Sequence, residues 1–341
     1  MKSVYNLSVL LLAACTSKEP RTPDEAGGDS ATVVDSGEAS PGDTADSDEQ
    51  WHEPCPIDAY ESRTMAVNGV NLNVACRGAG ATTVVFLHGF PEWHYSWNAV
   101  IDELVGEYRL IAPDQRGYNT SDKPDELEDY ALPVLAEDIT QLLPLVSADP
   151  VILVAHDWGG PVGWMVAHGL RDAQAPPHVG GFVAANGPHP VRFAELIATD
   201  AEQQAASSYM DFFRSEAADT ALTPEVLSGW FDFLSEADLA LYVEAWSQPG
   251  AIPGGLNWYR ANTLDEEAAA QWLALMNPTI EVPVTVLWGL DDDAVLPQNA
   301  EGLEPYASDL VVETFEGVDH WIEHRIPQEV ARAIREVHGR M

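Results

Sequence analysis

The stretch Val151-Ile-Leu-Val-Ala-His-Asp157-Trp-Gly-Gly160 decides the fold of this chain. Its continuous apolar run is typical of a strand that is buried on both faces of a parallel sheet. The small residues Ala155 and Gly159 flank Asp157, as a strained strand-to-helix turn requires, because backbones crowd there. The stretch therefore predicts a nucleophile elbow in which Asp157 takes the usual place of serine. Alternatively, Asp157 only caps the helix that follows.

Strands and helices alternate along the chain on both sides of this stretch. Apolar runs that predict buried strands fall at residues 83–87, 110–113, 181–185, 284–288 and 310–315, and residues 70–76 alternate like a half-exposed strand. Helical patterns lie between them, for example at residues 132–145 and 162–170. Such alternation predicts an α/β fold, with a mostly parallel sheet that is covered by helices on both faces.

Residues 190–276 interrupt this alternation, because they contain no clear buried strand. They are rich in Ala, Glu, Trp and Tyr, with helical spacing in Tyr209-Met210-Phe212-Phe213. We therefore expect a helical cap inserted after the sixth strand. The cap would separate a first part of the core at residues 55–189 from a second part at residues 277–341.

The first residues, 1–14, resemble the signal peptide of a bacterial lipoprotein. A short apolar run ends in Leu12-Ala13-Ala14-Cys15 and is too short to span a bilayer as a permanent helix. The resemblance implies cleavage before Cys15 and lipid on this residue, so that the protein reaches the membrane only through the lipid. No Asp follows Cys15, which favours the outer membrane, with the protein periplasmic or surface-exposed. An ordinary secretory signal that is cut nearby is the alternative.

Residues 15–54 are rich in Ser, Asp, Glu, Gly, Pro and Thr and nearly lack large apolar side chains. This composition predicts a disordered acidic tether, because such a segment buries too little surface to offset its ordering entropy. The whole chain carries 16 basic and 55 acidic residues. A balance this acidic argues against nucleic acid and anionic lipid as electrostatic partners, and it favours high solubility.

Cys55 and Cys76 are the two remaining cysteines, and order is expected to begin near the first of them. In an oxidising cell envelope the two are expected to pair, which closes a loop worth about 3 kcal/mol by the loop-entropy model. Two separate buried thiols are the alternative.

The segment His88-Gly-Phe-Pro-Glu92 follows a predicted strand. Its turn can direct the backbone N–H of Phe90 toward Asp157, opposite the N–H of Trp158. Two such donors would form an oxyanion hole. A plain Gly-Pro loop is the alternative.

A triplet of carboxylates and a histidine complete the pattern. Asp291-Asp292-Asp293 follow the strand predicted at 284–288, and His320 follows the last predicted strand. The order nucleophile, acid, histidine is typical of folds with a nucleophile elbow, and neutral imidazole accepts a proton from water near pH 7. His324 lies four residues after His320, but no third ligand is near and a helix is expected only from Pro327, so we expect no metal.

From about Tyr60 to its end, the chain resembles the α/β-hydrolase-fold epoxide hydrolases. The matching stretches are HGFPEWHYSW (88–97), DQRGYNTSDKP (114–124), AHDWGG (155–160), GGLNWYR (254–260), WGLDDDAVLP (288–297) and GVDHW (317–321). The resemblance implies an α/β-hydrolase fold and an enzyme that needs no cofactor and acts on a small apolar epoxide.

By these motifs, the resemblance implies that Asp157 is the nucleophile and His320 the base. The family's acid lies three residues after the Gly of its WGxxD motif, which selects Asp292, although the two neighbouring Asp residues stay open. Asn186, at a position where some relatives carry their acid, is uncharged and so supports Asp292.

Two tyrosines of the cap hold the epoxide oxygen in that family. Tyr259, in LNWYR, matches one of them, and Tyr209, in SSYMDFF, matches the other more loosely. The chemistry agrees, because ring opening develops charge on oxygen and a phenol donates a hydrogen bond to it. Core aromatic side chains are the alternative. Trp93 and Trp158 are expected to contact the substrate together with the two tyrosines.

Two other functions compete with this interpretation. Haloalkane dehalogenases share the Asp, the His and the Trp after the elbow Asp, but they typically carry Asn where this chain has Phe90. The second competitor is a surface lipoprotein that binds a ligand under its cap without catalysis.

Overall fold

The computed structural model describes residues 50–169 and 178–341. The expected signal at residues 1–14, Cys15 and nearly all of the expected tether at residues 15–54 lie outside this part of the chain.

Order begins earlier than we expected from the sequence. Trp51 is buried in the core with an exposed fraction of 1 %. Its backbone N–H donates to the carbonyl of Leu145, and its ring packs beneath the guanidinium of Arg63. The expected boundary after residue 54 is therefore wrong, because one large aromatic residue at the end of the polar segment has a site in the core.

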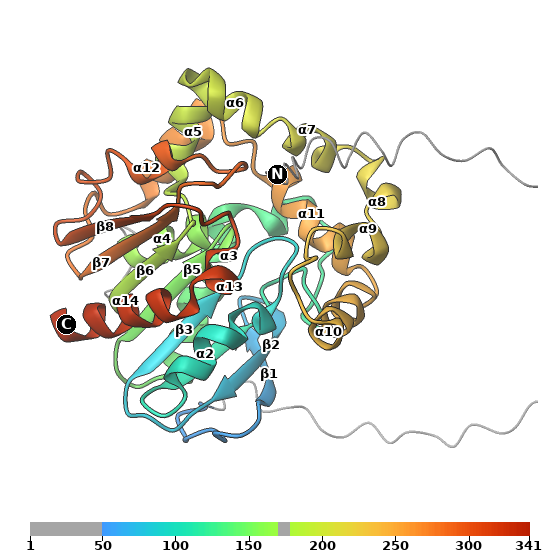
Figure 1. Ribbon diagram of the computed structural model, residues 1–341. Coiled ribbons are helices and arrows are strands. Elements are labelled where there is room, and N and C mark those ends of the chain that lie inside the picture. Colours follow the sequence, from blue (N-terminus) through green and yellow to red (C-terminus); the bar gives the residue numbers. More distant parts are fainter. Residues whose placement is uncertain (1–49, 170–177) are drawn as a thin grey trace, which may run out of the picture.

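The core is one eight-stranded sheet with the order β1-β2-β4-β3-β5-β6-β7-β8 (Figure 1). The strands are β1 (Glu61–Val67), β2 (Val70–Arg77), β3 (Thr83–Leu87), β4 (Arg109–Pro113), β5 (Val151–His156), β6 (Val179–Ala185), β7 (Val284–Gly289) and β8 (Leu310–Phe315). β1 and β2, and β2 and β4, pair antiparallel, whereas all other neighbours pair parallel. The expected α/β fold with a mostly parallel sheet is thus confirmed.

The two edges of the sheet are where the predictions from sequence are wrong. β1 was not expected, because its side chains are mostly exposed or half-buried and it has no apolar run. β8 was expected to be buried on both faces, yet Val311 and Val312 are 38 % and 40 % exposed. β8 is the last strand of the sheet, and the C-terminal helix α14 (Pro327–Arg340) packs over β5, β6 and β7 instead.

Helices cover both faces of the sheet. α2 (Asn98–Leu104) and α14 pack together on one face, and α3 (Leu132–Val146) and α4 (Gly159–His168) pack together on the other. α14 shows why a helix forms there, since its buried residues Val330, Ile334 and Val337 repeat every three or four positions and form one apolar stripe. α4 begins at Gly159, earlier than its expected start at residue 162, because the elbow leads directly into the helix.

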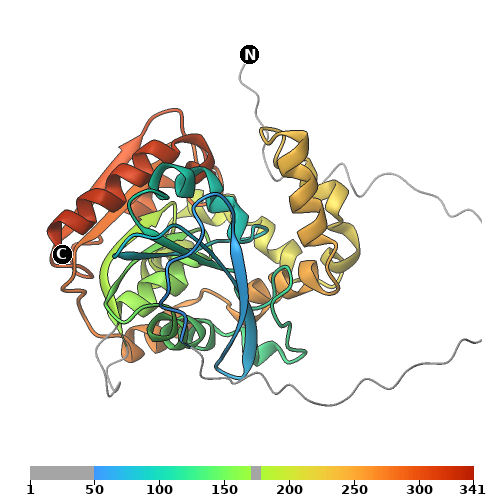
Figure 2. The same ribbon diagram turned by 90° about the horizontal axis from the view of Figure 1, so that it is seen from below.

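The chain between β6 and β7 forms a cap of helices, as expected, and most of these helices stand to one side of the core (Figures 1 and 2). Its helices are α5 (Pro190–Thr199), α6 (Ala201–Ala206), α7 (Tyr209–Arg214), α8 (Ala218–Ala221), α9 (Pro224–Ser228), α10 (Glu236–Trp246), α11 (Ala251–Ala261) and α12 (Glu266–Leu275). Side-chain oxygens of Asp200, Ser235 and Asp265 accept from the first N–H groups of α6, α10 and α12, which explains where these helices begin. Within the described ranges, no helix is long and apolar enough to cross a membrane.

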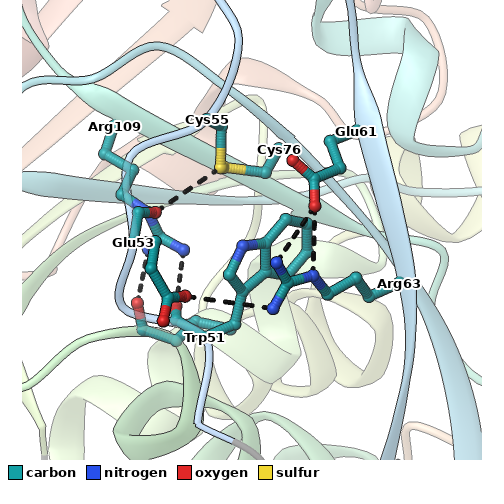
Figure 3. Close-up of a disulfide and its surroundings, with 8 residues drawn as sticks. Trp51, Glu53, Cys55, Glu61, Arg63, Cys76 and Arg109 are labelled. Carbon is teal, nitrogen blue, oxygen red and sulfur yellow. Dashed lines mark hydrogen bonds and ion pairs between the residues drawn. A yellow bond between two sulfur atoms is a disulfide. The ribbon is translucent and has the colours of Figure 1, made fainter.

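The N-terminal segment is attached to the sheet by what we call the N-terminal clamp, formed by Trp51, Cys55, Cys76 and Arg109 (Figure 3). Cys55 and Cys76 form the expected disulfide, with their Cα atoms 5.9 Å apart. Arg109, the first residue of β4, donates to the backbone carbonyls of Glu53 and Trp51. The clamp therefore lies where β4 begins, at the amino ends of the parallel strands.

Two histidines join the segments through which the chain enters and leaves the cap. His168 ends α4, and His189 directly precedes α5. Their Nε2 atoms lie 3.1 Å apart, and His168 Nδ1 lies 2.7 Å from the carbonyl oxygen of Asn277, just beyond the cap. Because His168 Nδ1 donates to that carbonyl, its Nε2 accepts from His189, and the pair is satisfied only while both rings are neutral. Burial lowers the pKa of His168 to about 4, despite the opposing hydrogen bond to Asn277.

Acid is expected to destabilise the protein through this pair. The folded-state pKa of His168 lies below its ordinary value, so the unfolded chain binds a proton first. The free energy of unfolding should therefore fall as the pH drops from about 6.5 to about 4, by an amount on the order of 3 kcal/mol from this group. Urea unfolding at a series of pH values measures the slope. His168→Asn keeps a donor near Asn277 without a titrating ring and should reduce that slope, and an unchanged slope would contradict the prediction.

Candidate active site

Asp157 lies at a tight turn between β5 and α4. Its φ of +46° is in the left-handed region, which is unusual for a residue with a side chain and is typical of strained functional turns. A Cβ atom on Gly159 would lie 2.4 Å from the carbonyl oxygen of Leu87, and one on Gly89 would lie 2.2 Å from the Cβ of Asp157. The small residues in AHDWGG and HGFP therefore allow the turn and the neighbouring loop to approach each other.

The two carboxylate oxygens of Asp157 face different groups. Oδ1 accepts a hydrogen bond of 2.7 Å from the backbone N–H of Phe90. Oδ2 lies 3.6 Å from Nε2 of His320. No side chain caps α4, so the alternative interpretation of Asp157 as a helix cap is wrong. One oxygen is thus held by the backbone while the other faces an imidazole.

Asp292 is the member of the aspartate triplet that reaches His320. Its Oδ2 lies 2.8 Å from His320 Nδ1, and the side-chain amide of Asn186 donates to the same oxygen at 2.6 Å. Its Oδ1 accepts from the backbone N–H groups of Ala294 and Val295. The two neighbouring aspartates are exposed, whereas Asp292 is buried. From the sequence, Asn186 was considered only because it is uncharged where some relatives carry their acid. In the structure its side-chain amide orients Asp292.

The charges of this group reinforce one another. Burial alone would raise the pKa of Asp292, but the charge and hydrogen bond of His320 hold it below its usual range. Burial alone would likewise lower the pKa of His320, but the carboxylates of Asp292 and Asp157 raise it well above its usual value. With Asp157 ionised, the imidazole therefore carries a proton between two carboxylates.

The tyrosines expected to act on the substrate lie close to Asp157. Tyr209 lines a cavity of about 270 Å³ together with Asp157 and Trp158. Tyr259 packs with its ring perpendicular to that of Trp158 at 5.2 Å and lies 6.4 Å from the ring of Tyr209. Burial raises the pKa of both tyrosine hydroxyls, and the charge of Asp157 raises it further. Both side chains therefore stay protonated and are hydrogen-bond donors.

Trp93, which was expected to contact the substrate, does not line the cavity beside Asp157. It lines a second cavity of about 260 Å³, together with Phe90 and Trp246. The ring of Phe90 also contacts Tyr259, at 5.4 Å, so Phe90 lies between the surroundings of Asp157 and the second cavity. The ring of Trp93 stacks on that of Tyr95, with the ring centroids 5.7 Å apart.

A buried group of charged residues next to the site was not predicted from the sequence. Glu92, His156, Glu323 and His324 are all buried or nearly so, and we call them the acid–imidazole cluster. Glu92 and His156 stand in the quoted motifs, but neither was considered for a role, and His324 was considered only as a metal ligand beside His320. A histidine inside a buried apolar strand was the signal that could have found the cluster, because such a ring needs a partner.

Comparisons with known proteins agree with this geometry. Residues 82–322 match the family model described as alpha/beta hydrolase fold. The AB hydrolase superfamily protein YfhM of Bacillus subtilis is 33 % identical over 293 residues, which cover 82 % of this chain and 98 % of that protein. Epoxide hydrolase A of Mycobacterium tuberculosis is 30 % identical over 324 residues, which cover 82 % and 97 %. The crystal structure of Bacillus megaterium epoxide hydrolase with an inhibitor has a TM-score of 0.71 at 32 % identity, covering 81 % of this chain and 100 % of that one.

Proposed function

The chain belongs to the alpha/beta hydrolase family, and from this premise we propose how its site works. The protein is an epoxide hydrolase, which opens an epoxide to a vicinal diol. Similarity to epoxide hydrolases over most of the chain supports this function. The single observation that carries the mechanism is the carboxylate of Asp157, with one oxygen bonded to the backbone of Phe90 and the other facing His320.

In the first step, Oδ2 of Asp157 attacks a ring carbon of the epoxide. A C–O bond forms to Asp157 while the C–O bond to the ring oxygen breaks, which gives an ester and leaves the electron pair on that oxygen. Tyr209 and Tyr259 donate hydrogen bonds to the developing charge and supply the proton. A neutral phenol suits this role because its proton is not lost before the ring opens.

In the second step, water attacks the carbonyl carbon of the Asp157 ester. His320 takes a proton from the water, and Asp292 stabilises the imidazolium. Ester formation has removed the charge of Asp157, one of the two groups that raise the pKa of His320, so the imidazole is more readily neutral at this stage. The oxyanion forms on the oxygen that the Phe90 N–H already holds, with the Trp158 N–H as the second donor.

Collapse of this intermediate breaks the C–O bond between the carbonyl carbon and the diol oxygen, which takes the proton left on the added hydroxyl, and Asp157 returns as a carboxylate. The proton that His320 carried before ester formation passes to solvent when the charge of Asp157 is lost, and it is regained when Asp157 is ionised again. The proton on His320 returns to the tyrosine through solvent, so that epoxide and water are the only reactants consumed.

Loss of a cap tyrosine hydroxyl is expected to slow ring opening. Tyr259→Phe and Tyr209→Phe should each lower the rate of ester formation about 10- to 100-fold, and the double variant about 10²- to 10⁴-fold, because positioned acids contribute on this scale. Stopped-flow fluorescence with excess epoxide measures the rate. Tyr108→Phe removes the hydroxyl of another buried tyrosine, one that contacts His338 away from Asp157, and should leave the rate unchanged. If both cap variants match this control, the tyrosines are only structural.

Styrene oxide and a bromoalkane, offered to the same preparation, test the function itself. Diol from styrene oxide without halide release is the expected result. Phe90 favours it, because its side chain packs against Phe213 and Tyr259 and has no amide to bind a halide. Halide release without diol would instead identify a dehalogenase, and no turnover of either compound would favour a ligand-binding protein.

We also propose that Cys15 carries lipid and attaches the protein to the bacterial cell envelope, with the outer membrane as its site. The support is the sequence Leu12-Ala13-Ala14-Cys15 alone. Mass spectrometry of the mature N-terminal peptide tests it, because an acylated cysteine at its first position is required.

A further inference from the structure

We propose that His156 is a positioning residue that fixes the His320 base relative to Asp157. This inference rests on the proposed two-step reaction. His156 is the last residue of β5 and directly precedes Asp157. Its Nε2 lies 2.9 Å from the backbone carbonyl oxygen of His320. It therefore joins the loop that carries the base to the strand that carries the nucleophile.

The surroundings of His156 give both of its ring nitrogens the role of donor. A carbonyl oxygen only accepts, so Nε2 donates to His320. Nδ1 lies 3.2 Å from an oxygen of Glu92 and 3.3 Å from an oxygen of Glu323. Burial raises the pKa of Glu323 to about 7. Despite its burial, the pKa of Glu92 is held below its usual range by His156 and His324, so the nearer acceptor at Nδ1 is an ionised carboxylate. The ring is therefore held as an imidazolium with no exposed surface.

The rest of the acid–imidazole cluster supports this charge. His324 Nε2 lies 2.9 Å from the second oxygen of Glu92, and the hydroxyl of Tyr242 lies 3.4 Å from that oxygen. In the described part of the chain, no group donates a hydrogen bond to either buried oxygen of Glu323, so the nearest compensation for its charge is the charge on the two imidazoles. Burial alone would lower the pKa of His156, but Glu323 and Glu92 raise it to about 9.

Two contacts then fix the base from different sides. Asp292 holds Nδ1 of His320 from the end of β7, and His156 holds its backbone carbonyl from the end of β5. The backbone N–H of Ile322 also donates to this carbonyl, but it belongs to the same loop and gives no link to the nucleophile. The His156 contact, in contrast, ties the loop of the base to β5, the strand that directly precedes Asp157. A misplacement of about 1 Å costs a reaction of this kind about 100-fold.

The contact should matter for one of the two steps only. Ring opening uses Asp157 and the tyrosines, whereas ester hydrolysis needs His320 close to the ester. Loss of the link should therefore slow hydrolysis and let the ester accumulate, while ester formation continues.

Two variants of His156 separate this role from general stability. His156→Asn places an amide near Nδ1 and loses the bond to His320, whereas His156→Gln places an amide near Nε2 and keeps it. Both variants lose the same charge beside Glu92 and Glu323, so the midpoint temperature of thermal unfolding should fall by a similar amount in both. Single-turnover measurements with styrene oxide should show hydrolysis slowed about 10- to 100-fold in the Asn variant, with the ester on Asp157 detected by mass spectrometry. Ester formation should change less than about threefold, and the Gln variant should hydrolyse close to the wild-type rate.

The inference is overturned if the two variants hydrolyse the ester at equal rates, or if the Asn variant slows ester formation and ester hydrolysis by equal factors. Diol formation by the wild-type protein would still support the proposed function in either case. No ester in the wild-type protein and in His320→Gln would overturn the proposed function and this inference with it.

Glu323→Gln provides a second test that does not depend on folding of the His156 variants. It removes one carboxylate beside Nδ1 at nearly constant shape, so the His156 proton should be lost at lower pH. A ring that loses its proton from Nδ1 still donates from Nε2 to the carbonyl of His320. The ratio of the variant's hydrolysis rate to that of the wild-type protein should therefore stay constant as the pH rises from about 7 to about 9, the pKa of His156 in the wild-type protein. A ratio that falls over this range would show that the charge of the ring, and not its hydrogen bond to His320, sets the rate, and would contradict the positioning role.

Discussion

Replacing Asp157 with alanine is expected to lower diol formation roughly 10⁴-fold or more, to the limit of detection. The carboxylate supplies the new bond in the first step, and the remaining groups provide no other nucleophile at this position. Its Oδ1 is already bonded to Phe90 and its Oδ2 faces His320, so the chemistry of both steps passes through this side chain. Gas or liquid chromatography of the diol from styrene oxide measures the loss.

Folding must be separated from chemistry in this experiment, because Asp157 has a positive φ. Alanine tolerates the left-handed region less well than aspartate, at a cost of roughly 1–2 kcal/mol. Asp157→Asn is the matched control, since asparagine suits this backbone and still accepts from the Phe90 N–H. Both variants should unfold cooperatively and lack activity. A folded variant of either kind that forms diol at a substantial fraction of the wild-type rate would contradict the nucleophile assignment.

His320→Gln should form one ester per molecule and then stop. Without a base, water is not activated, so hydrolysis should slow about 10²- to 10⁴-fold while ring opening proceeds. Intact mass after incubation with epoxide should rise by the mass of one substrate molecule, and the peptide that contains Asp157 should carry it. His52→Gln changes an exposed histidine at the other end of the strands and should turn over normally. Loss of turnover without an ester would mean that His320 acts in ring opening instead.

Local patterns explain how much of the fold was predictable. The apolar runs of β3, β4, β5, β6 and β7 predicted their positions because strands buried on both faces leave no alternation to misread. At the edges this rule fails. β1 has no apolar run, and the valines of β8 look like a buried strand although nothing covers them fully. Burial at an edge depends on which helices reach it, and this is a tertiary property.

The same difference between local patterns and tertiary contacts decides which parts of the active site were predictable. The turn at Asp157 and the HGFP loop were predictable because each is encoded within a few residues. Asp292 could not be separated from its two neighbours by residue type, since the three carboxylates differ in burial rather than in chemistry. The acid–imidazole cluster draws on three segments, the HGFPE loop, the end of β5 and the helix α13 (Ile322–Arg325). No spacing in the sequence brings these segments together, so only the fold does.

The N-terminal clamp keeps the attachment of the N-terminal segment away from the catalytic loops. The clamp lies where the parallel strands start, and Asp157, Asp292 and His320 lie beyond their other ends, a strand length of about 17–20 Å away. A pull on residue 50 is resisted by the disulfide and the Trp51 site before it reaches the catalytic loops.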